Sequence, residues 1–530
     1  MKLQQQNIER YIPWILFVAL LAYYLSGSNA SIFMYDEARN AGCAREMFER
    51  ADMVVPTFNY ELRTDKPPLH YWFMMVSFSL FGVNEFSARL FSAILGALTV
   101  LMMYCMALRY FGLKAALYAV LVFATSLNLL FEFHLAVPDP YLIFFLTAAH
   151  FSFFLFYDTR KTRYLLWLYL ATGLAILAKG PVALGFVGLN GMIWLLVKKD
   201  FNWKTIAAFK IWLGIAIVAI VVAPWVIQVG IATQWEWPKA FIFEHNISRF
   251  SNEMEGHGGL FLLIPAFAML AFLPFSVFLY QAYRKAFRMA RQNDFILWSI
   301  IVSLVILIFF SFSATKLPNY PMPAYPFVAL ILGYYLSDSL MKEMTSMLLV
   351  NILIGVAIPV AGYIAISKNP NLVSITPVLY LLTLIPITAV LALLFSMKGF
   401  SKWWMLGTLA SGWIVAGWLT FSFVMPDISR NEPGVKAAAA MDKTRPVAYY
   451  KQLNSSFPFY LQKPIYRLES QDEVVKFFNM YPSGYLITTA GHAKDLDLKP
   501  LSKLIGQKEL FESPTTEVYY WPLANPEKVE

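Results

Sequence analysis

Apolar runs of spanning length recur along the chain and are separated by short polar stretches. A helix of about 20 apolar residues matches the hydrocarbon thickness of a bilayer, because each residue adds about 1.5 Å. The pattern predicts thirteen membrane-spanning helices, and hence an all-α polytopic membrane protein. We place them at residues 11–26, 87–108, 113–131, 139–157, 164–178, 180–197, 208–228, 260–281, 294–312, 322–340, 346–366, 375–396 and 403–424.

Three regions fall outside this pattern and divide the chain into a transmembrane domain, residues 1–425, and a soluble C-terminal domain, residues 426–530. The first is a loop over residues 27–86, and the second is a loop over residues 229–259. The sequence of the first loop predicts two helices that lie at the membrane surface, one beginning at Asp36-Glu37 and one beginning at Leu69. Lys66-Pro67-Pro68 between them favours extended backbone, since proline disfavours helix in the preceding residue.

The C-terminal domain alternates short β-prone runs with a helical stretch. The β-prone runs begin at Pro446, Pro464, Tyr485 and Glu517, and the helical stretch is Gln471–Met480. This alternation predicts a small α/β domain. It contains no catalytic motif, so we expect it to stabilise the protein or to act in docking.

Composition and charge support a membrane protein and give its orientation. Hydrophobic residues make up 58% of the chain and charged residues only 14%, against about 25% in soluble domains. The net charge of +9 is explained by topology rather than by nucleic acid, because basic residues collect in cytoplasmic loops. With the N-terminus inside, eighteen Lys and Arg residues lie in cytoplasmic segments and five in the opposing short loops. The two long loops and the C-terminal domain are therefore expected to face outward.

The outward loops carry the residues that could perform chemistry. These clusters contain Asp36-Glu37-Arg39, Asp65-Lys66, Asp139, Glu244-His245 with Arg249 and His257, and Lys316 with Tyr320 and Tyr325. Carboxylates suit a general base or a metal ligand, whereas Lys, Arg and Tyr suit a phosphate. Local pairing is the alternative, with Arg39 on Glu37 and Asp65 on Lys66. Lys179-Gly180-Pro181 favours a turn with a lysine that reaches toward the interface.

Several of these motifs together resemble a known family. The runs that carry the resemblance begin at Asp36 (DEARNAGCAREM), Lys66 (KPPLHYW), Leu80 (LFGVNEFSARL), Gly173 (GLAILAKGPV), Glu244 (EHNISRF) and Lys316 (KLPNY). They resemble the bacterial 4-amino-4-deoxy-L-arabinose lipid A transferases, which are grouped with the protein O-mannosyltransferases in the GT-C class of glycosyltransferases. The resemblance covers residues 10–340.

The resemblance implies roles for individual residues. Asp36 corresponds to the catalytic Asp of the family's Asp-Glu pair, with Glu37 in support, and Asp139 corresponds to the acidic residue at the start of the fourth span. Lys66, Arg249 and Tyr320 correspond to residues that bind the carrier phosphate, and Tyr325 is a further candidate for that contact.

A divalent metal ion is a further expectation from the resemblance. In relatives, a Glu before Lys-Pro-Pro and a His of the second loop can hold such an ion. Here Asp65 takes the place of that Glu, so the candidate ligands are Asp65, His245 and His257.

The activity implied by the resemblance is inverting transfer of a sugar from a polyprenyl-phosphate carrier to an acceptor at the outer face of the bacterial inner membrane. The acceptor would be a lipid A-like glycolipid, a protein or a glycan, and the enzyme a monomer among membrane lipids. A transporter of a lipid-linked or anionic substrate is the main alternative, although transporters commonly carry internal repeats, which are not seen here. A structural partner of a cell-envelope complex is the third possibility.

Overall fold

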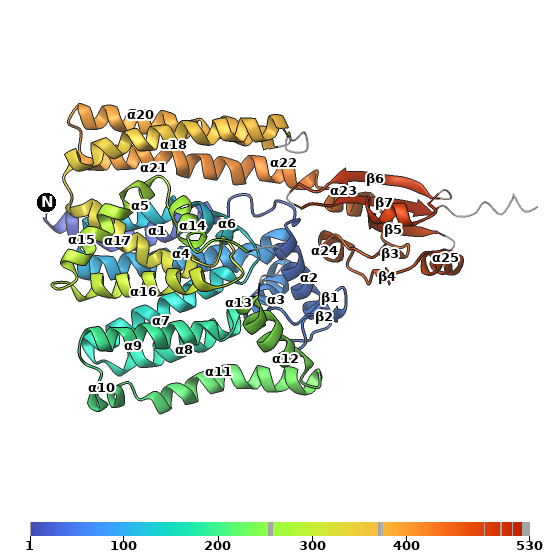
Figure 1. Cartoon of the computed structure of the whole chain (residues 1–530), viewed down its shortest axis with the longest axis horizontal. Helices are drawn as coiled ribbons and strands as arrows, with labels where there is room; N and C mark the ends of the chain where they lie inside the picture. Colours follow the sequence, from blue (N-terminus) through green and yellow to red (C-terminus); the bar gives the residue numbers. More distant parts are fainter. Residues whose placement is uncertain are drawn as a thin grey trace, which may run out of the picture.

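The computed structural model describes residues 2–252, 258–368, 373, 375–481, 483–498, 501–510 and 512–521, with the side chains of residues 2–10 and 249 excepted. A bundle of long helices occupies one end of the molecule, and a smaller domain containing a sheet extends from the other end (Figure 1). The N-terminus lies at the end of the bundle farthest from the sheet domain.

The bundle contains the predicted apolar segments as helices. They are α1 (Lys2–Tyr24), α4 (Glu85–Phe111), α5 (Leu113–Ala124), α6 (Leu127–His134), α7 (Asp139–Thr159), α8 (Thr162–Lys179), α9 (Val182–Val197), α10 (Trp203–Ala208), α11 (Ile211–Ala232), α14 (Leu263–Ala271), η2 (Phe275–Phe278), α15 (Leu279–Met289), α16 (Asp294–Phe312), α17 (Tyr325–Asp338), α18 (Met341–Lys368), α19 (Thr376–Leu382), α20 (Leu384–Met397) and α21 (Lys402–Leu419).

In the described residues, seven helices are long and apolar enough to cross a membrane, or up to nine if each of two bent pairs counts as one span. One bent pair joins α5 to α6 at 69°, and the other joins α14 to the helix from Phe275 to Met289 at 117°. The protein is therefore a multi-pass membrane protein, while the count of thirteen spans stays a prediction.

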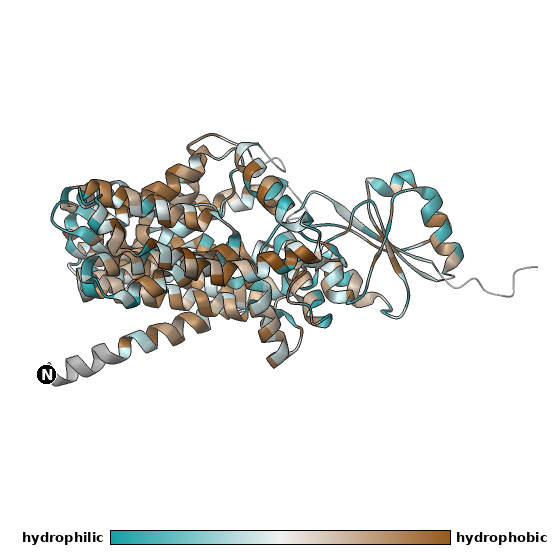
Figure 2. Cartoon of the chain, turned by 90° about the horizontal axis from the view of Figure 1, so that it is seen from below, coloured by the Kyte–Doolittle hydropathy of each residue, from teal (hydrophilic) through white to brown (hydrophobic). Residues whose placement is uncertain are grey.

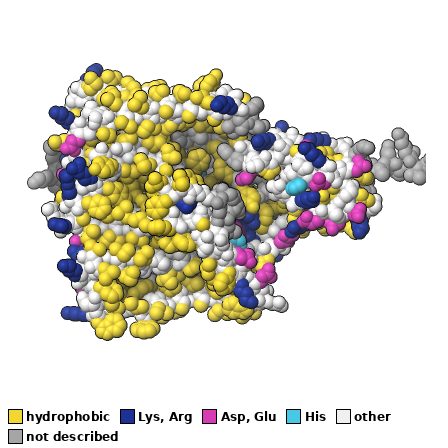
Figure 3. Space-filling model, viewed as in Figure 1, with side chains coloured by type: hydrophobic (Ala, Val, Ile, Leu, Met, Phe, Trp, Pro, Cys, Tyr) yellow, Lys and Arg dark blue, Asp and Glu magenta, His cyan; other side chains and the backbone are white. Residues whose placement is uncertain are grey.

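The outer surface of the bundle is apolar, as lipid contact requires. In the span from Trp203 to Ala232 and in α18, only 11% of the apolar stretch is buried inside the protein. Figure 2 shows hydrophobic residues along the bundle, and Figure 3 shows hydrophobic side chains over most of its visible face, with Lys and Arg along the edge near the N-terminus. Such a broad apolar surface would be unfavourable in water and is stable in a bilayer.

The first loop forms two helices where they were predicted, α2 (Tyr35–Glu49) and α3 (Leu69–Phe81), with a short hairpin of β1 (Thr57–Phe58) and β2 (Glu61–Leu62) between them. Their place at the membrane surface stays a prediction. The second loop forms α12 (Glu236–Ile242), a π-helical turn η1 (Phe243–Ser248) and α13 (Arg249–Ser251). A further turn, η3 (Met322–Ala324), precedes α17. The helices and strands of the two loops that Figure 1 labels gather at the end of the bundle that faces the sheet domain.

The C-terminal domain is α/β, as predicted. It follows η5 (Thr420–Val424) and consists of α22 (Met425–Arg430), α23 (Pro433–Ala440), β3 (Val447–Tyr450), α24 (Ser456–Leu461), β4 (Tyr466–Leu468), α25 (Gln471–Met480), β5 (Gly484–Thr489), η6 (His492–Asp495), β6 (Ser502–Lys508) and β7 (Thr515–Trp521). The sheet order is β4-β3-β5-β7-β6. β3 is parallel to β4 and β5, and β7 is antiparallel to β5 and β6.

The central strands of this sheet are buried on both faces. Val447 and Tyr449 of β3 belong to one hydrophobic core, and Ala448 and Tyr450 belong to the core on the opposite face. This division follows from the two-residue repeat of a strand, which sends successive side chains to opposite faces. The sheet is thus covered on both sides by the helices of its own domain.

Candidate functional site

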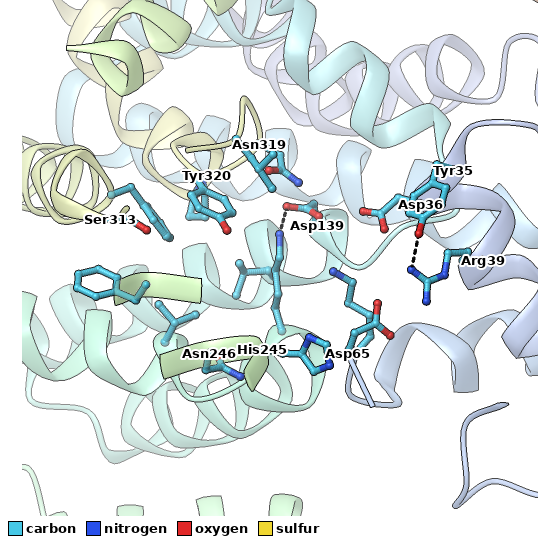
Figure 4. Close-up of a pocket in the computed structure, with 18 of the residues that line it drawn as sticks. Tyr35, Asp36, Arg39, Asp65, Asp139, His245, Asn246, Ser313, Asn319 and Tyr320 are labelled. Carbon is cyan, nitrogen blue, oxygen red and sulfur yellow. Dashed lines mark hydrogen bonds and ion pairs between the residues drawn. The ribbon is translucent and has the colours of Figure 1, made fainter. Parts of the chain in front are cut away.

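A cavity of about 940 Å³ opens between the bundle, the first two loops and the C-terminal domain. Figure 4 shows side chains from the bundle and from the first two loops facing one another across it. Its polar and charged lining residues are Tyr35, Asp36, Arg39, Asp65, Lys66, Asp139, Lys179, His245, Asn246, Ser251, Ser313, Asn319, Tyr320, Glu432, Glu509 and Glu512. The predicted outer clusters therefore contribute to one cavity, although they are far apart in the sequence.

Asp36 lies in the first turn of α2 and borders the cavity, to which its side chain is exposed. The surrounding protein disfavours its charge, but the nearby cations Lys66 and Arg63 outweigh that effect and hold the pKa of Asp36 below its ordinary value. Asp36 is therefore a carboxylate at neutral pH. It can accept a proton or a hydrogen bond from a group in the cavity.

Glu37, the next residue, points away from the cavity into the protein. It is 1% exposed and forms a two-pronged ion pair with Arg89 of α4, at 2.6 and 2.8 Å. It also accepts a hydrogen bond from the backbone N–H of Ala136, at 2.9 Å. Glu37 therefore pairs with Arg89 and not with Arg39, which was the predicted alternative. Arg39 instead donates to the Tyr35 hydroxyl at 3.0 Å.

Asp65 and Lys66 both border the cavity but have different surroundings. Arg63 binds the two oxygens of Asp65 at 2.6 and 3.1 Å, so the predicted Asp65–Lys66 pair is replaced by an Asp65–Arg63 pair. Burial opposes the charge of Asp65, but Arg63 outweighs it, and the pKa of Asp65 lies well below its ordinary value. Lys66 is 9% exposed and forms no ion pair within 4 Å among the described residues.

Lys179 is a cavity residue that sequence analysis interpreted as part of a turn. Its ammonium group lies 2.5 Å from the carboxylate of Asp139, which begins α7 (Figure 4). Glu132 of α6 is close enough to both to interact electrostatically. The sequence did contain a sign that Lys179 belongs to the site, because the run Ala178-Lys179-Gly180-Pro181 is part of one of the motifs that carry the family resemblance.

The remaining candidates fall into three groups. Tyr320 and His245 border the cavity, with Tyr320 against the ring of Phe310 and His245 within 3.1 Å of the Thr64 hydroxyl. Tyr325 is fully buried in α17 against Phe272 and is not part of the cavity lining. His257 and the side chain of Arg249 lie outside the described part of the structure.

The described residues do not fit the expected metal ion. No three His, Cys, Asp or Glu side chains come together in the described part of the chain in a way that could hold one. Asp65 is engaged by Arg63 through both of its oxygens. His257, the third candidate ligand, is outside the described residues. We therefore assign no chemical step to a metal.

Part of the cavity lining is apolar and includes Phe241, Ile247, Phe250, Phe309 and Phe310. A lipid chain would find favourable contacts with these side chains, while an anionic group would be bound by the lysines of the lining. The cavity can thus hold a molecule with a long apolar tail and an anionic head group.

Comparison with known proteins places the chain in a family. The model of the dolichyl-phosphate-mannose-protein mannosyltransferase family matches residues 65–227. An uncharacterised protein of Aquifex aeolicus is 32% identical over 335 residues, covering 62% of this chain and 74% of the relative. An undecaprenyl phosphate-α-4-amino-4-deoxy-L-arabinose arabinosyl transferase of Erwinia tasmaniensis is 29% identical over 361 residues, or 66% of this chain and 64% of that enzyme's length.

A solved structure supports the same placement at the level of the fold. ArnT from Cupriavidus metallidurans, crystallised with undecaprenyl phosphate, has a TM-score of 0.79 to this chain at 21% sequence identity. The match covers 97% of this chain and 99% of that one. Since it includes the C-terminal domain, the whole architecture is shared. The chain therefore belongs to the GT-C membrane glycosyltransferases that are related to the aminoarabinose and protein mannosyl transferases.

Proposed function

We propose that the protein is an inverting glycosyltransferase that moves a sugar from a polyprenyl-phosphate carrier to an acceptor of the cell envelope. The observation that carries this proposal is a cavity lined both by charged side chains, Asp36 and Lys66 among them, and by aromatic and apolar ones such as Phe250 and Phe309. A polyprenyl phosphate has both kinds of surface, with an anionic head and a long apolar tail. The names of the aminoarabinose transferases, and the undecaprenyl phosphate bound to ArnT, support this donor class.

The donor phosphate is assigned to Lys66. Of the cavity cations with described side chains, Lys179 is paired with Asp139, whereas Lys66 and Arg39 have no ion-pair partner within 4 Å among the described residues. Arg39 donates to the Tyr35 hydroxyl instead, which leaves Lys66 for the phosphate. A phosphate beside Lys66 would gain a charge-assisted hydrogen bond. Arg249, expected from the sequence to contact the same phosphate, lies on the second loop.

The reaction is a displacement at the anomeric carbon of the sugar. An oxygen of the acceptor forms the new bond, the bond from that carbon to the carrier phosphate breaks, and the phosphate leaves with the electron pair. Asp36 orients the acceptor hydroxyl and takes its proton. Lys66 stabilises the charge that develops on the leaving phosphate, where electrostatic catalysis has the largest effect. An acceptor that is already an anionic phosphate needs only positioning by Asp36.

The site is assigned to the outer face of the bacterial inner membrane. The concentration of Lys and Arg at the end near the N-terminus supports this orientation (Figure 3). The acceptor class is a lipid A-like glycolipid, a protein or a glycan. Mass spectrometry of envelope lipids, glycans and surface proteins from a deletion strain would identify it by the sugar that disappears.

The test of the activity is direct. Purified protein is incubated with a radiolabelled polyprenyl-phosphate sugar, with and without an envelope extract as acceptor. We expect label to move to the extract, or slow hydrolysis of the donor in its absence. Tight donor binding without either product would contradict the proposal and favour a transporter.

A further inference from the structure

The C-terminal domain packs closely against the first loop of the transmembrane domain. Figure 1 shows α24 beside α2. Phe459 of α24 is 3% exposed and belongs to the same hydrophobic core as Ile32 before α2 and Ala41 within it. This shared core makes the first loop and the C-terminal domain one packed unit at the mouth of the cavity.

One contact of this interface lies just before Asp36. The hydroxyl of Tyr460 in α24 accepts a hydrogen bond from the backbone N–H of Ile32, at 2.6 Å, and donates to the carboxylate of Glu85, at 3.0 Å. The N–H of Ser31 donates to the hydroxyl of Ser429 in α22, at 2.9 Å. The segment that follows, residues 33–36, borders the cavity. The backbone that leads to Asp36 is therefore tied to the C-terminal domain.

A second contact lies before Lys66. Asn59, in the turn between β1 and β2, donates from its side chain to the carbonyl of Ile465 and accepts from the N–H of Ile465, each at 2.9 Å. Asn59 has a φ of +54°, a left-handed conformation that asparagine tolerates better than most residues. Glu46 holds that turn by accepting from the backbone N–H groups of Asn59 and Tyr60, at 2.8 and 2.9 Å.

We propose that the C-terminal domain is a positioning element of the transferase site, setting Asp36 through Tyr460 and the Asp65–Lys66 segment through Asn59. This inference rests on the proposed function. Neither Tyr460 nor Asn59 borders the cavity, so both act through the backbone of the first loop. Because misplacement of a reacting group by about 1 Å can cost 100-fold in rate, such supports affect turnover without touching the substrate.

The test uses full-length variants that change single side-chain groups. Tyr460→Phe deletes only the hydroxyl, and with it the bonds to Ile32 and Glu85. Tyr466→Phe is its matched control, since the Tyr466 hydroxyl contacts Tyr481 within the C-terminal domain. Asn59→Asp keeps the acceptor for the Ile465 N–H and loses the donor to its carbonyl. Asn454→Asp is its control, because Asn454 makes its bonds to Thr516 and Ser456 within the domain.

Turnover, affinity for polyprenyl phosphate, melting temperature and hydrogen exchange by mass spectrometry are measured on each variant. We expect Tyr460→Phe to lower turnover by about 10-fold or more, with donor affinity within twofold of wild type and faster exchange in the peptide covering residues 30–38. Asn59→Asp should instead weaken donor affinity and speed exchange over residues 57–66. Both controls should match the wild type in all of these measurements except melting temperature.

Failure of this inference is distinguishable from failure of the proposed function. A wild-type protein that neither transfers nor hydrolyses the donor contradicts the proposed function. The hydrogen exchange of residues 30–38 in Tyr460→Phe then still shows whether α24 stabilises the first loop. Unchanged exchange in Tyr460→Phe, or faster exchange with unchanged turnover in an active background, overturns the positioning role. Equal losses in Tyr460→Phe and Tyr466→Phe overturn it as well, since they would reflect general stability.

Discussion

At the scale of single residues, Asp36 and Glu37 are adjacent carboxylates with separate surroundings. Neighbouring side chains on a helix point about 100° apart, so only one of the two can face the cavity. That residue is Asp36, while Glu37 turns to Arg89 and the N–H of Ala136. Different roles were expected for the two from the family resemblance, with Glu37 in support of Asp36, but the partner considered for Glu37 was Arg39 rather than Arg89.

Asp36→Asn should keep the fold and donor binding while lowering turnover onto a hydroxyl acceptor by about 10²–10⁴, the usual contribution of a positioned base. Glu37→Gln should lower turnover far less per folded molecule and lower the melting temperature more, because Arg89 loses its charge partner. Turnover and melting curves of the two purified variants distinguish these effects. If both variants lost stability to the same extent and kept equal activity, both carboxylates would only stabilise the start of the helix.

Lys66→Ala should weaken binding of polyprenyl phosphate by about 1.5–3 kcal/mol, the contribution of one hydrogen bond to a charged group. The reason is that Lys66 borders the cavity without a carboxylate partner within 4 Å among the described residues. Lys239→Ala, at an exposed position of α12, is the control. Equal affinities of the two variants, measured by titration with the unlabelled carrier, would remove Lys66 from the donor site.

At the scale of elements, the start of α2 is fixed to α4 by a buried ion pair. Arg89 binds Glu37 and also donates to the backbone carbonyls of Ser28 and Ala30. Glu37 in turn accepts a hydrogen bond from the backbone N–H of Ala136, three residues before Asp139. One pair therefore connects the segments that carry Asp36 and Asp139, the two acidic residues predicted to be catalytic.

Arg89→Met should destabilise the protein by about 3–5 kcal/mol, because Glu37 would remain buried without its cation. The double variant Glu37→Gln/Arg89→Met should recover much of that loss, since no unpaired charge is left. Melting temperatures of the wild type, both single variants and the double variant form the test. A double variant that is less stable than Arg89→Met would show that the pair is not the source of the effect.

At the scale of the whole molecule, the C-terminus should lie outside the cytoplasm. Alkaline phosphatase fused after Glu530 should be active, because the enzyme requires export and the basic residues lie mainly at the opposite end of the bundle (Figure 3). Activity of the fusion in whole cells is the measurement. An inactive fusion that is well expressed would reverse the orientation.

The junction between bundle and C-terminal domain should be sensitive to pH through Glu432. Burial, together with the nearby carboxylates Glu509 and Glu512, raises the pKa of Glu432 to about 7, against an ordinary value of 4.5. The folded state therefore binds a proton at Glu432 more tightly than the unfolded state does. This difference adds to the free energy of unfolding below pH 4.5, and the contribution is lost as pH rises through 7.

The melting temperature should therefore fall between pH 5 and pH 8 by more in the wild type than in Glu432→Gln. The variant is a matched control because it removes the titrating group and keeps its shape. Melting curves of both proteins across this range provide the comparison. Identical pH dependence would show that Glu432 titrates normally.

The sequence by itself determined the elements whose pattern is local. Helices α2, α3 and α25 lie where periodicity and proline predicted them, and strands β3, β4, β5 and β7 follow the β-prone runs. Strand β6 (Ser502–Lys508) was not predicted, because it is an exposed strand at the edge of the sheet and lacks an apolar alternation. The family was also recognisable from motifs, since those are read directly along the chain.

Only the tertiary structure decided which side chains meet. Lys179 pairs with Asp139, 40 residues away, and Asp65 pairs with Arg63 rather than with the adjacent Lys66. Tyr460 reaches Ile32 across 428 positions, which gives the C-terminal domain a place beside the site. Periodicity specifies which face of an element is apolar, but the partner of a charge depends on how distant elements pack. That packing is set by the total apolar surface that all the elements bury together, and no local sequence pattern specifies it.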